Sequence, residues 1–297
     1  MTMKRREFLG RSAAALAALG AGEMFPLQLP AQVEANPDIS AAQGKSLPQV
    51  LDRALFPFGG MANFVHRGDK VVILPNPQGN RPGVSTSAPL IGELVRLCLE
   101  AGAAEAVVAS IHSPGRWFGT GIVKAVEDAG GKMHYPQSAK DWLEISLPGG
   151  RRLKKATIIR KSRENDILIN VPIVKQHDST MITAGLKNLM GFNLDNQSFH
   201  QGDEHLHQSI ADLATLFLPP LLVVDALTIL TENGPFGPGR TVSPQSIVAG
   251  TDMVAVDAYC CRFLGLKPDE VGHISLAHQM GLGNKDLSGR KIIEARV

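Results

Sequence analysis

The sequence contains few cysteines and few aromatic residues. Its 297 residues include three cysteines, two tryptophans and two tyrosines. With three cysteines and no C-x-x-C pair, the chain alone cannot supply the four thiolates of an iron–sulfur cluster or of a cysteine-type structural zinc site. Cys98, Cys260 and Cys261 lie in apolar segments, which favours buried thiols. A disulfide from Cys98 to one of the other two is the alternative.

The chain also lacks a strong charge of either sign. Its formal net charge is +2 at pH 7, and neither a basic block nor an alternation of basic and aromatic residues is present. The charge pattern of a nucleic-acid-binding protein is therefore absent, and we expect no DNA or RNA partner. No apolar run approaches the roughly 20 residues that a membrane-spanning helix needs, so no membrane span is expected after signal cleavage.

The first 35 residues have the pattern of an export signal. Arg5 and Arg6 precede a Phe-Leu pair and a short run of small, apolar residues. Such a pattern is typical of a secretory signal, and the paired arginines resemble the twin-arginine motif. Small residues allow cleavage after Ala31 or Ala35. We predict export of the folded protein by the twin-arginine machinery to a periplasmic or otherwise extracytoplasmic location; a signal retained as an anchor is the alternative.

The rest of the chain has the pattern of an α/β protein. Residues 36–46 are small and polar, which predicts a linker, and residues 47–297 are expected to form a single domain. Strands alternating with helices predict a mostly parallel sheet with helices on both faces. Residues 142–159 predict a small β-rich insertion. Five apolar runs are typical of buried strands: residues 69–76, 106–110, 166–171, 221–226 and 246–249.

Polar side chains lie at the ends of three of these strands. Asn76 ends the first strand, Asn170 lies near the end of another, and Asp225 ends a third. Ligands of open parallel sheets bind outside the carboxyl ends of the strands, so these side chains would converge if the strands were neighbours. For each residue taken alone, a loop or capping role is the alternative.

The connection that follows Asn170 is the richest in polar groups. It contains Lys175, His177, Lys187 and Asn188 among hydroxyl-bearing residues and glycines. Lysines supply positive charge, and backbone N–H groups donate hydrogen bonds of defined direction. Together they suit a small anion. No G-x-x-x-x-G-K-[ST] motif occurs, and the glycine-rich residues 234–239 predict a turn-forming lid rather than a phosphate-binding loop.

Three of the nine histidines, His200, His205 and His207, fall within eight positions. Imidazole and carboxylate ligands suit zinc, iron or manganese. On an extended segment, histidines two residues apart face the same way, and His200 would reach them across a glycine turn. These positions therefore predict a site for a divalent transition metal, with a polar surface loop as the alternative.

In their order along the chain, these segments resemble the domain-of-unknown-function 362 (DUF362) family. The resemblance implies the α/β fold and a site at these residues, but no established reaction. Family members often carry a cysteine-rich, ferredoxin-like part that is absent here, and Leu74 and Pro75 replace a common lysine. The resemblance extends over residues 71–283 and rests on Asn76, residues 166–172, Lys175, His177 and residues 185–191, 210–213, 225–226, 234–235 and 249–258.

Two classes of function fit these residues. The first is an enzyme acting on a small anionic substrate, with or without a metal, by hydrolysis, isomerisation or redox chemistry. In it, His177 would be an acid–base group or a metal ligand, while Lys175 and Lys187 would stabilise negative charge. The second is a non-catalytic periplasmic protein that holds a metal or an anion for a partner. In the enzyme, Asp225 would help to hold the metal. Four side chains are expected to contact the ligand: Asn76, Asn170, Asn188 and Asp225.

Overall fold

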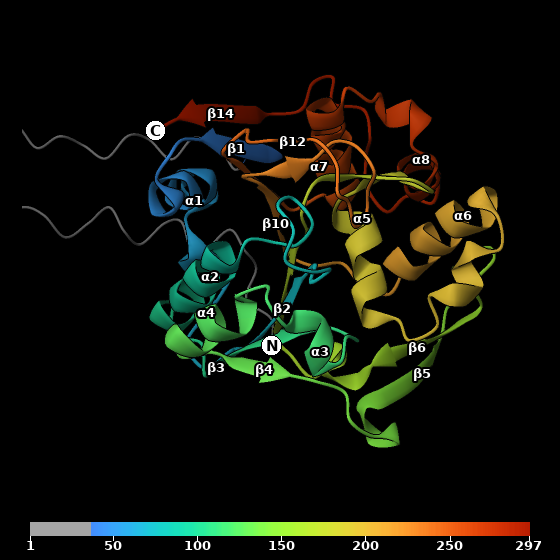
Figure 1. Ribbon diagram of the computed structural model, residues 1–297, viewed down its shortest axis with the longest axis horizontal. Coiled ribbons are helices and arrows are strands. Elements are labelled where there is room, and N and C mark those ends of the chain that lie inside the picture. The colour runs from blue at the N-terminus through green and yellow to red at the C-terminus, as the bar shows by residue number, and fades with distance from the viewer. Residues whose placement is uncertain (1–36) are drawn as a thin grey trace, which may run out of the picture. The chain divides into compact units, whose positions relative to one another are not determined.

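A sheet of eight strands forms the centre of the protein, of which a computed structural model describes residues 37–297. The strands follow the order β14-β1-β13-β10-β7-β2-β3-β4 (Figure 1). The pairs from β10 to β4 are parallel, as is the pair β1 and β14, whereas β13 is antiparallel to both of its neighbours. The predicted α/β fold with a mostly parallel sheet is confirmed. The strands are β1 (Ile39–Gln43), β2 (Lys70–Pro75), β3 (Glu105–Ala109), β4 (Lys132–His134), β7 (Ile167–Val171), β10 (Leu221–Ala226), β13 (Ser246–Gly250) and β14 (Ile292–Arg296).

Helices cover both faces of this sheet, because its central strands are apolar on both sides. In β2, Val71 and Ile73 join the core beneath one helical layer, whereas Val72 and Leu74 join the core on the opposite face. One layer consists of α1 (Leu47–Leu55), α2 (Ala88–Glu100) and α4 (Ile122–Asp128), which Figure 1 shows in blue and green. The other consists of α5 (Gly185–Asn188), α6 (Asp203–Ala214), α7 (Met253–Cys260) and α8 (Gly272–Gln279).

Smaller elements lie outside the central sheet. The predicted β-rich insertion is the ribbon of β5 (Trp142–Ser146) and β6 (Lys155–Ile159). A second ribbon, β8 (Lys175–His177) with β9 (Met181–Thr183), carries two of the predicted site residues. The remaining strands and α-helix are the ribbon of β11 (Ile229–Leu230) and β12 (Thr241–Val242) and the short helix α3 (Pro114–Trp117); short 3-10 helices occur in several connections.

The predicted linker at residues 36–46 is wrong. Ile39–Gln43 forms β1, which lies inside the sheet between β13 and β14. Ile39 is fully buried and pairs with Gly250 on one side and Ile292 on the other. The folded domain therefore begins before residue 47.

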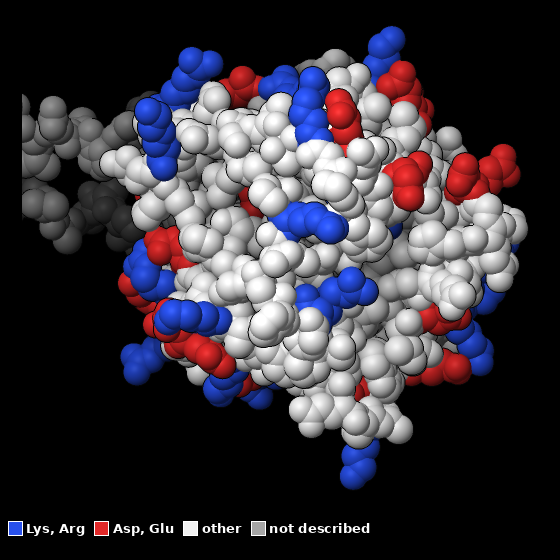
Figure 2. Space-filling model, viewed as in Figure 1, with Lys and Arg blue, Asp and Glu red and all other residues white. Residues whose placement is uncertain are grey.

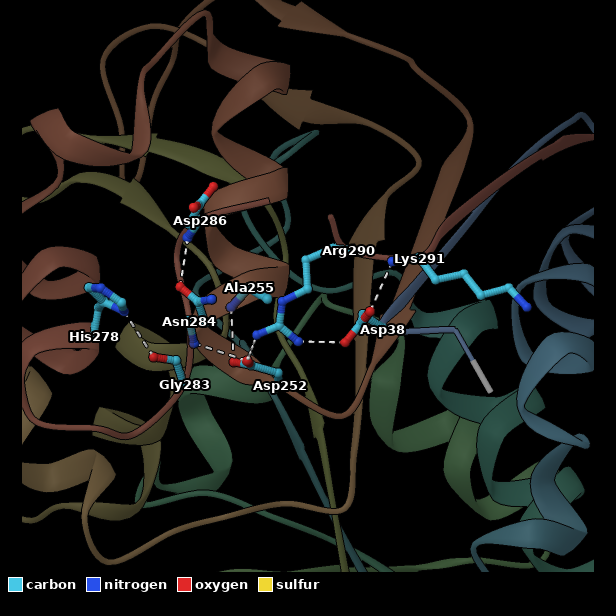
Figure 3. Close-up of polar contacts among 9 residues, drawn as sticks. All are labelled: Asp38, Asp252, Ala255, His278, Gly283, Asn284, Asp286, Arg290 and Lys291. Atoms are coloured by element: carbon cyan, nitrogen blue, oxygen red, sulfur yellow. Dashed lines mark hydrogen bonds and ion pairs between the residues drawn. The ribbon is translucent and has the colours of Figure 1, made fainter. Parts of the chain in front are cut away.

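Asp252, at the start of α7, is joined to residues 284–290 and, through Arg290, to Asp38 (Figure 3). One carboxylate oxygen accepts the backbone N–H of Ala255 at 3.0 Å and caps α7. The other accepts the backbone N–H of Asn284 at 3.0 Å and the guanidinium of Arg290 at 2.9 Å. Arg290 also forms an ion pair with Asp38, directly before β1. This cluster attaches the first strand to the C-terminal segment.

The cysteines are free and buried, as the apolar surroundings predicted. Cys98 lies in the core beneath α2, whereas Cys260 and Cys261 lie in the core on the other face of the sheet. No helix within residues 37–297 is both long and apolar enough to cross a bilayer. The predicted signal peptide falls outside the described residues.

Candidate functional site

A cavity of about 350 Å³ lies beyond the carboxyl ends of β2 and β3. The ribbon of β8 and β9, helix α5 and the residues that follow α5 form other parts of its wall. Its polar lining includes both predicted lysines, Lys175 and Lys187, and three histidines. The sequence-predicted residues that line it are Asn76, Lys175, His177, Lys187, Asn188 and His200.

Lys175 lies at the wall of this cavity and is 1 % exposed. Its ammonium group donates to the backbone carbonyl of Val84 at 2.6 Å and to Asn76 Oδ1 at 3.1 Å. Burial, together with the nearby charge of Lys187, lowers the pKa of Lys175 to about 7. Because an ammonium group has three donors, one remains after these two hydrogen bonds.

Three asparagine side chains continue from Lys175 as one hydrogen-bonded chain. Asn76 donates to Asn188 Oδ1 at 3.0 Å, and Asn188 in turn donates to Asn170 Oδ1 at 2.8 Å. Asn170 donates to the backbone carbonyl of Gly185 at 2.9 Å. Every amide therefore donates in the same direction, away from the lysine. Asn170 is fully buried and does not line the cavity, so its position supports the other two amides.

Lys187 differs from Lys175 in having no oxygen acceptor among the residues that the structure describes. Its hydrogen-bond contact is with the thioether sulfur of Met190 at 3.5 Å, and within residues 37–297 it forms no ion pair. Burial lowers the pKa of Lys187 to about 8, while the charge of Asp178 acts in the opposite direction. The amine lines the cavity. A desolvated lysine that lacks a counter-ion readily gives up its proton or binds an anion.

His177 and Asp178 both line the cavity, and their side chains contact each other. Its Nδ1 lies 2.8 Å from Asp178 Oδ1, and the backbone N–H of Ser179 donates to the same oxygen at 2.6 Å. With Nδ1 turned toward Asp178, Nε2 is the ring nitrogen left for the cavity. Burial and the charge of Lys187 lower the pKa of His177 to about 3. The imidazole is therefore neutral at pH 7 and a weak base.

The glycine-rich residues 234–239 form one rim of the cavity. Pro235 and Phe236 belong to its lining, and the Phe236 side chain is 48 % exposed. The backbone N–H of Gly234 donates to the side chain of Gln176 in β8. A Cβ atom at Gly234 would lie 1.7 Å from the carbonyl oxygen of Gln176, so this close approach requires glycine.

Asp225 lies outside this cavity, contrary to the expectation that three strand ends converge. Its carboxylate accepts the backbone N–H groups of Ser87 at 2.6 Å and Leu227 at 2.9 Å, and so caps the start of α2. It lines a separate cavity of about 200 Å³. Burial raises its pKa to about 6. Although β10 is adjacent to β7, Asp225 has the phase of Val223, on the α2 side of the sheet, whereas Asn170 has the phase of Leu168, on the α5 side.

The three histidines expected to bind a metal do not come together. His205 and His207 belong to α6, where residues two apart point in different directions, and not to an extended segment. His207 stacks on His273, with 3.0 Å between their Nδ1 atoms, whereas His200 lines the cavity. Within residues 37–297, no three His, Cys, Asp or Glu side chains are grouped so that they could hold a metal ion.

Among the polar residues of the cavity that sequence reasoning missed are Ser110 and His112. Both follow β3 directly, so the rule applied to the other strand ends would have found them. His112 Nε2 lies 3.2 Å from the side-chain nitrogen of Gln78, and burial lowers the pKa of this histidine to about 4. Its ring is therefore neutral at pH 7, like that of His177.

The distribution of charge favours a negatively charged ligand. In the face shown in Figure 2, Lys and Arg side chains lie both near the centre and around the rim, while Asp and Glu side chains lie mostly toward the rim. Asp178 is the acidic residue among those that line the cavity, and its carboxylate is directed to His177. Positive charge in a concave site attracts anions and raises their local concentration.

Comparison with known proteins shows that the residues lining this cavity lie in the part of the chain that matches a protein family. The family described as "Domain of unknown function (DUF362)" matches residues 71–262. The chain belongs to the DUF362 family. The thylakoid-associated protein sll1697 of Synechocystis sp. (strain ATCC 27184 / PCC 6803 / Kazusa) is 28 % identical over 253 residues, which cover 80 % of this chain and 76 % of that protein.

Among solved structures, this DUF362 protein is similar to the lactate racemase apoprotein from Thermoanaerobacterium thermosaccharolyticum. The TM-score is 0.48 and the identity 13 %, over 75 % of this chain and 56 % of that chain. The chain therefore spans a little over half the length of that protein. Within the DUF362 match itself lie both lysines and the three linked asparagines, so the cavity belongs to the part that defines the family.

Proposed function

We propose that the cavity binds a small organic anion and catalyses a proton transfer on it. The observation that carries this proposal is that two lysine amines, Lys175 and Lys187, line one cavity and neither is paired with a carboxylate in the described part of the chain. Burying two unpaired amines in one place costs free energy, which a bound anion would offset.

The pKa values assign different roles to the lysines and the histidine. Amines with pKa values of about 7 and 8 exchange protons readily near neutral pH, as an acid–base catalyst must. His177, with a pKa of about 3, is better suited to accept a hydrogen bond from the ligand than to remove its proton. Asn76 and Asn188 fix the orientation of Lys175 and offer neutral polar contacts.

A non-catalytic anion carrier would use the same contacts. Solvent exchange separates the two functions for any acid that has an exchangeable carbon-bound proton. The purified protein is incubated in D₂O with a panel of small organic acids, and ¹H NMR follows the loss of carbon-bound protons. Exchange that requires Lys187 supports an enzyme. Binding of an acid without exchange in the panel supports the carrier.

Two further proposals concern the surroundings of this reaction. We propose that the protein is exported folded by the twin-arginine route, which the Arg5-Arg6 signal supports. We also propose that any divalent metal taking part would bind together with the anion, since imidazole rings such as those of His112 and His177 line the cavity. Elemental analysis of the exported protein tests the second proposal.

A further inference from the structure

We infer that Lys187 is a nucleophile that forms an imine with a carbonyl-bearing organic acid, whose carboxylate is held by Lys175. This inference rests on the proposed function and adds the substrate class: a small acid with an aldehyde or ketone group near its carboxylate. It gives the two lysines of the cavity different tasks. The following observations distinguish them.

Lys175 is fixed by the protein. Two of its three donors are used by Val84 and Asn76, and its side chain is fully enclosed. An amine held in this way can offer its remaining N–H to a carboxylate, but it is not free to move onto a carbon atom. Lys175 is therefore suited to bind charge.

Lys187 has the opposite properties. Its amine meets the thioether of Met190 rather than an oxygen acceptor, and the residue is less completely buried than Lys175. An amine must lose its proton before it can attack a carbonyl carbon, and desolvation beside another cation favours that loss. Burial lowers the pKa of both lysines, and the charge of Lys187 lowers that of Lys175 further, so the two amines interact. Lys187 is the amine that is free to react.

The step balances without an oxidant or a reductant. The neutral Lys187 nitrogen attacks the carbonyl carbon and a C–N bond forms. The nitrogen gives one of its two protons to the former carbonyl oxygen, and the Lys175 ammonium group or the solvent supplies a second, so that the oxygen leaves as water and the nitrogen keeps one proton as a protonated imine. That imine withdraws electrons from the adjacent carbon atom, which makes a C–H bond there more acidic. Imine formation would therefore serve the proton transfer proposed above, with Lys175 close by as a proton carrier.

Reductive trapping tests this inference with a defined probe. Glyoxylate is a small acid with an aldehyde group, and cyanoborohydride converts its imine with lysine into a stable secondary amine. Peptide mass spectrometry measures the rate at each lysine, with the exposed Lys140 as an internal reference. At pH 7.5 we expect Lys187 to react at least about tenfold faster than Lys140. Burial lowers the pKa of Lys187 to about 8, whereas the usual lysine value is about 10.4, so more of the Lys187 amine is neutral. Acetaldehyde, which lacks a carboxylate, should keep only the part of this preference that the lowered pKa gives, so it should react more slowly than glyoxylate at Lys187.

Variants and controls separate the possible failures. Lys187→Arg keeps the positive charge but cannot form an imine, so it should retain glyoxylate binding and lose trapping; circular dichroism confirms that it is folded. If glyoxylate binds the wild-type protein but Lys187 is trapped no faster than Lys140, the imine is overturned and the anion site stands. If acetaldehyde reacts at Lys187 as fast as glyoxylate, the carboxylate-recognising part is overturned. If glyoxylate neither binds nor reacts, both the inference and the proposed anion site are overturned.

Discussion

Asp257 Oδ1 accepts the backbone N–H of Gly185 at 2.6 Å within the protein core. The second oxygen of the same carboxylate accepts the backbone N–H of Leu186 at 2.8 Å. These two N–H groups begin α5, the short helix that presents Lys187 and Asn188 to the cavity. A Cβ atom at Gly185 would lie within 3 Å of Asp257, so the close contact depends on glycine. Asp257 thus holds the helix that carries two residues of the cavity.

The Asp257 carboxylate makes stability depend on pH in a direction that can be measured. Burial raises its pKa to about 7, although the hydrogen bonds from Leu186 and Gly185 lower it. Because this folded-state pKa is above the unfolded value of about 3.9, its contribution to stability is complete at low pH and is lost as the pH rises through 7. Asp257→Asn removes the titration. We expect the stability advantage of wild type over the variant to shrink between pH 5 and pH 8.

Urea unfolding of both proteins at these two pH values checks this expectation. Asp225 also has a raised pKa, but it is present in both proteins and its effect cancels in the comparison. A stability difference that stays constant or grows with pH would contradict the raised pKa of Asp257.

The rule for strand ends explains which part of the site could be predicted from the sequence. Asn76 and Lys175 follow β2 and β7, which are adjacent and parallel, so both reach the same cavity. The structure places Asp225 outside the cavity and keeps the three clustered histidines apart, because local structure determines where these side chains point. The direction of a side chain depends on its phase along a strand or helix, and a stretch of residues read as extended formed α6 instead.

Strand β1 shows what the sequence could not reveal. Its residues, Ile-Ser-Ala-Ala-Gln, have little of the β-branched and aromatic character that marks a strand. It is fixed by pairing with β13 and β14, which lie more than 200 residues later in the chain. A window of neighbouring residues contains no information about such partners. Composition alone therefore made this buried strand resemble a linker.

Anion binding should weaken as the pH rises. Lys175 and Lys187, with pKa values of about 7 and 8, lose their positive charge between pH 6 and pH 9. Oxalate, whose charge is constant over this range, is a suitable probe. We expect its affinity by calorimetry to fall about tenfold or more from pH 6 to pH 9. Lys187→Met should weaken binding at pH 6 and flatten the pH dependence, whereas Lys140→Met should change neither. An affinity independent of pH would contradict charge recognition by these lysines.

The clustered histidines should respond differently to substitution. His200 lines the cavity, so His200→Ala should weaken oxalate binding several-fold. His207 stacks on His273 with ring centroids 5.2 Å apart, so His207→Ala should lower the melting temperature and leave binding largely unchanged. Elemental analysis provides the decisive control. Loss of one stoichiometric metal in each of His200→Ala, His205→Ala and His207→Ala would contradict the separation of these side chains.

Export by the twin-arginine route makes a prediction about the N-terminal residues. Replacing both Arg5 and Arg6 by lysine keeps the charge but removes the paired arginines that the machinery recognises. We expect cell fractionation to find the double variant in the cytoplasm and the wild type outside it. Lys4→Ala, which changes a charge beside the pair, should still be exported. Unchanged export of the double variant would exclude this route.

Arg290 should stabilise the fold by holding β1 to the rest of the domain. Its guanidinium pairs with Asp38 and with Asp252, and all three side chains are largely shielded, with exposures of 21 %, 33 % and 20 % respectively. Arg290→Ala leaves two partly buried carboxylates without their cation, which should cost about 1 to 3 kcal/mol in the free energy of unfolding. Arg296→Ala, at an exposed position in the neighbouring strand, is the matched control and should have little effect. Because Asp38 directly precedes β1, hydrogen exchange should also become faster in β1 than in β2. Equal protection of both strands in Arg290→Ala would mean that the pairing with β13 holds β1 without help from this cluster.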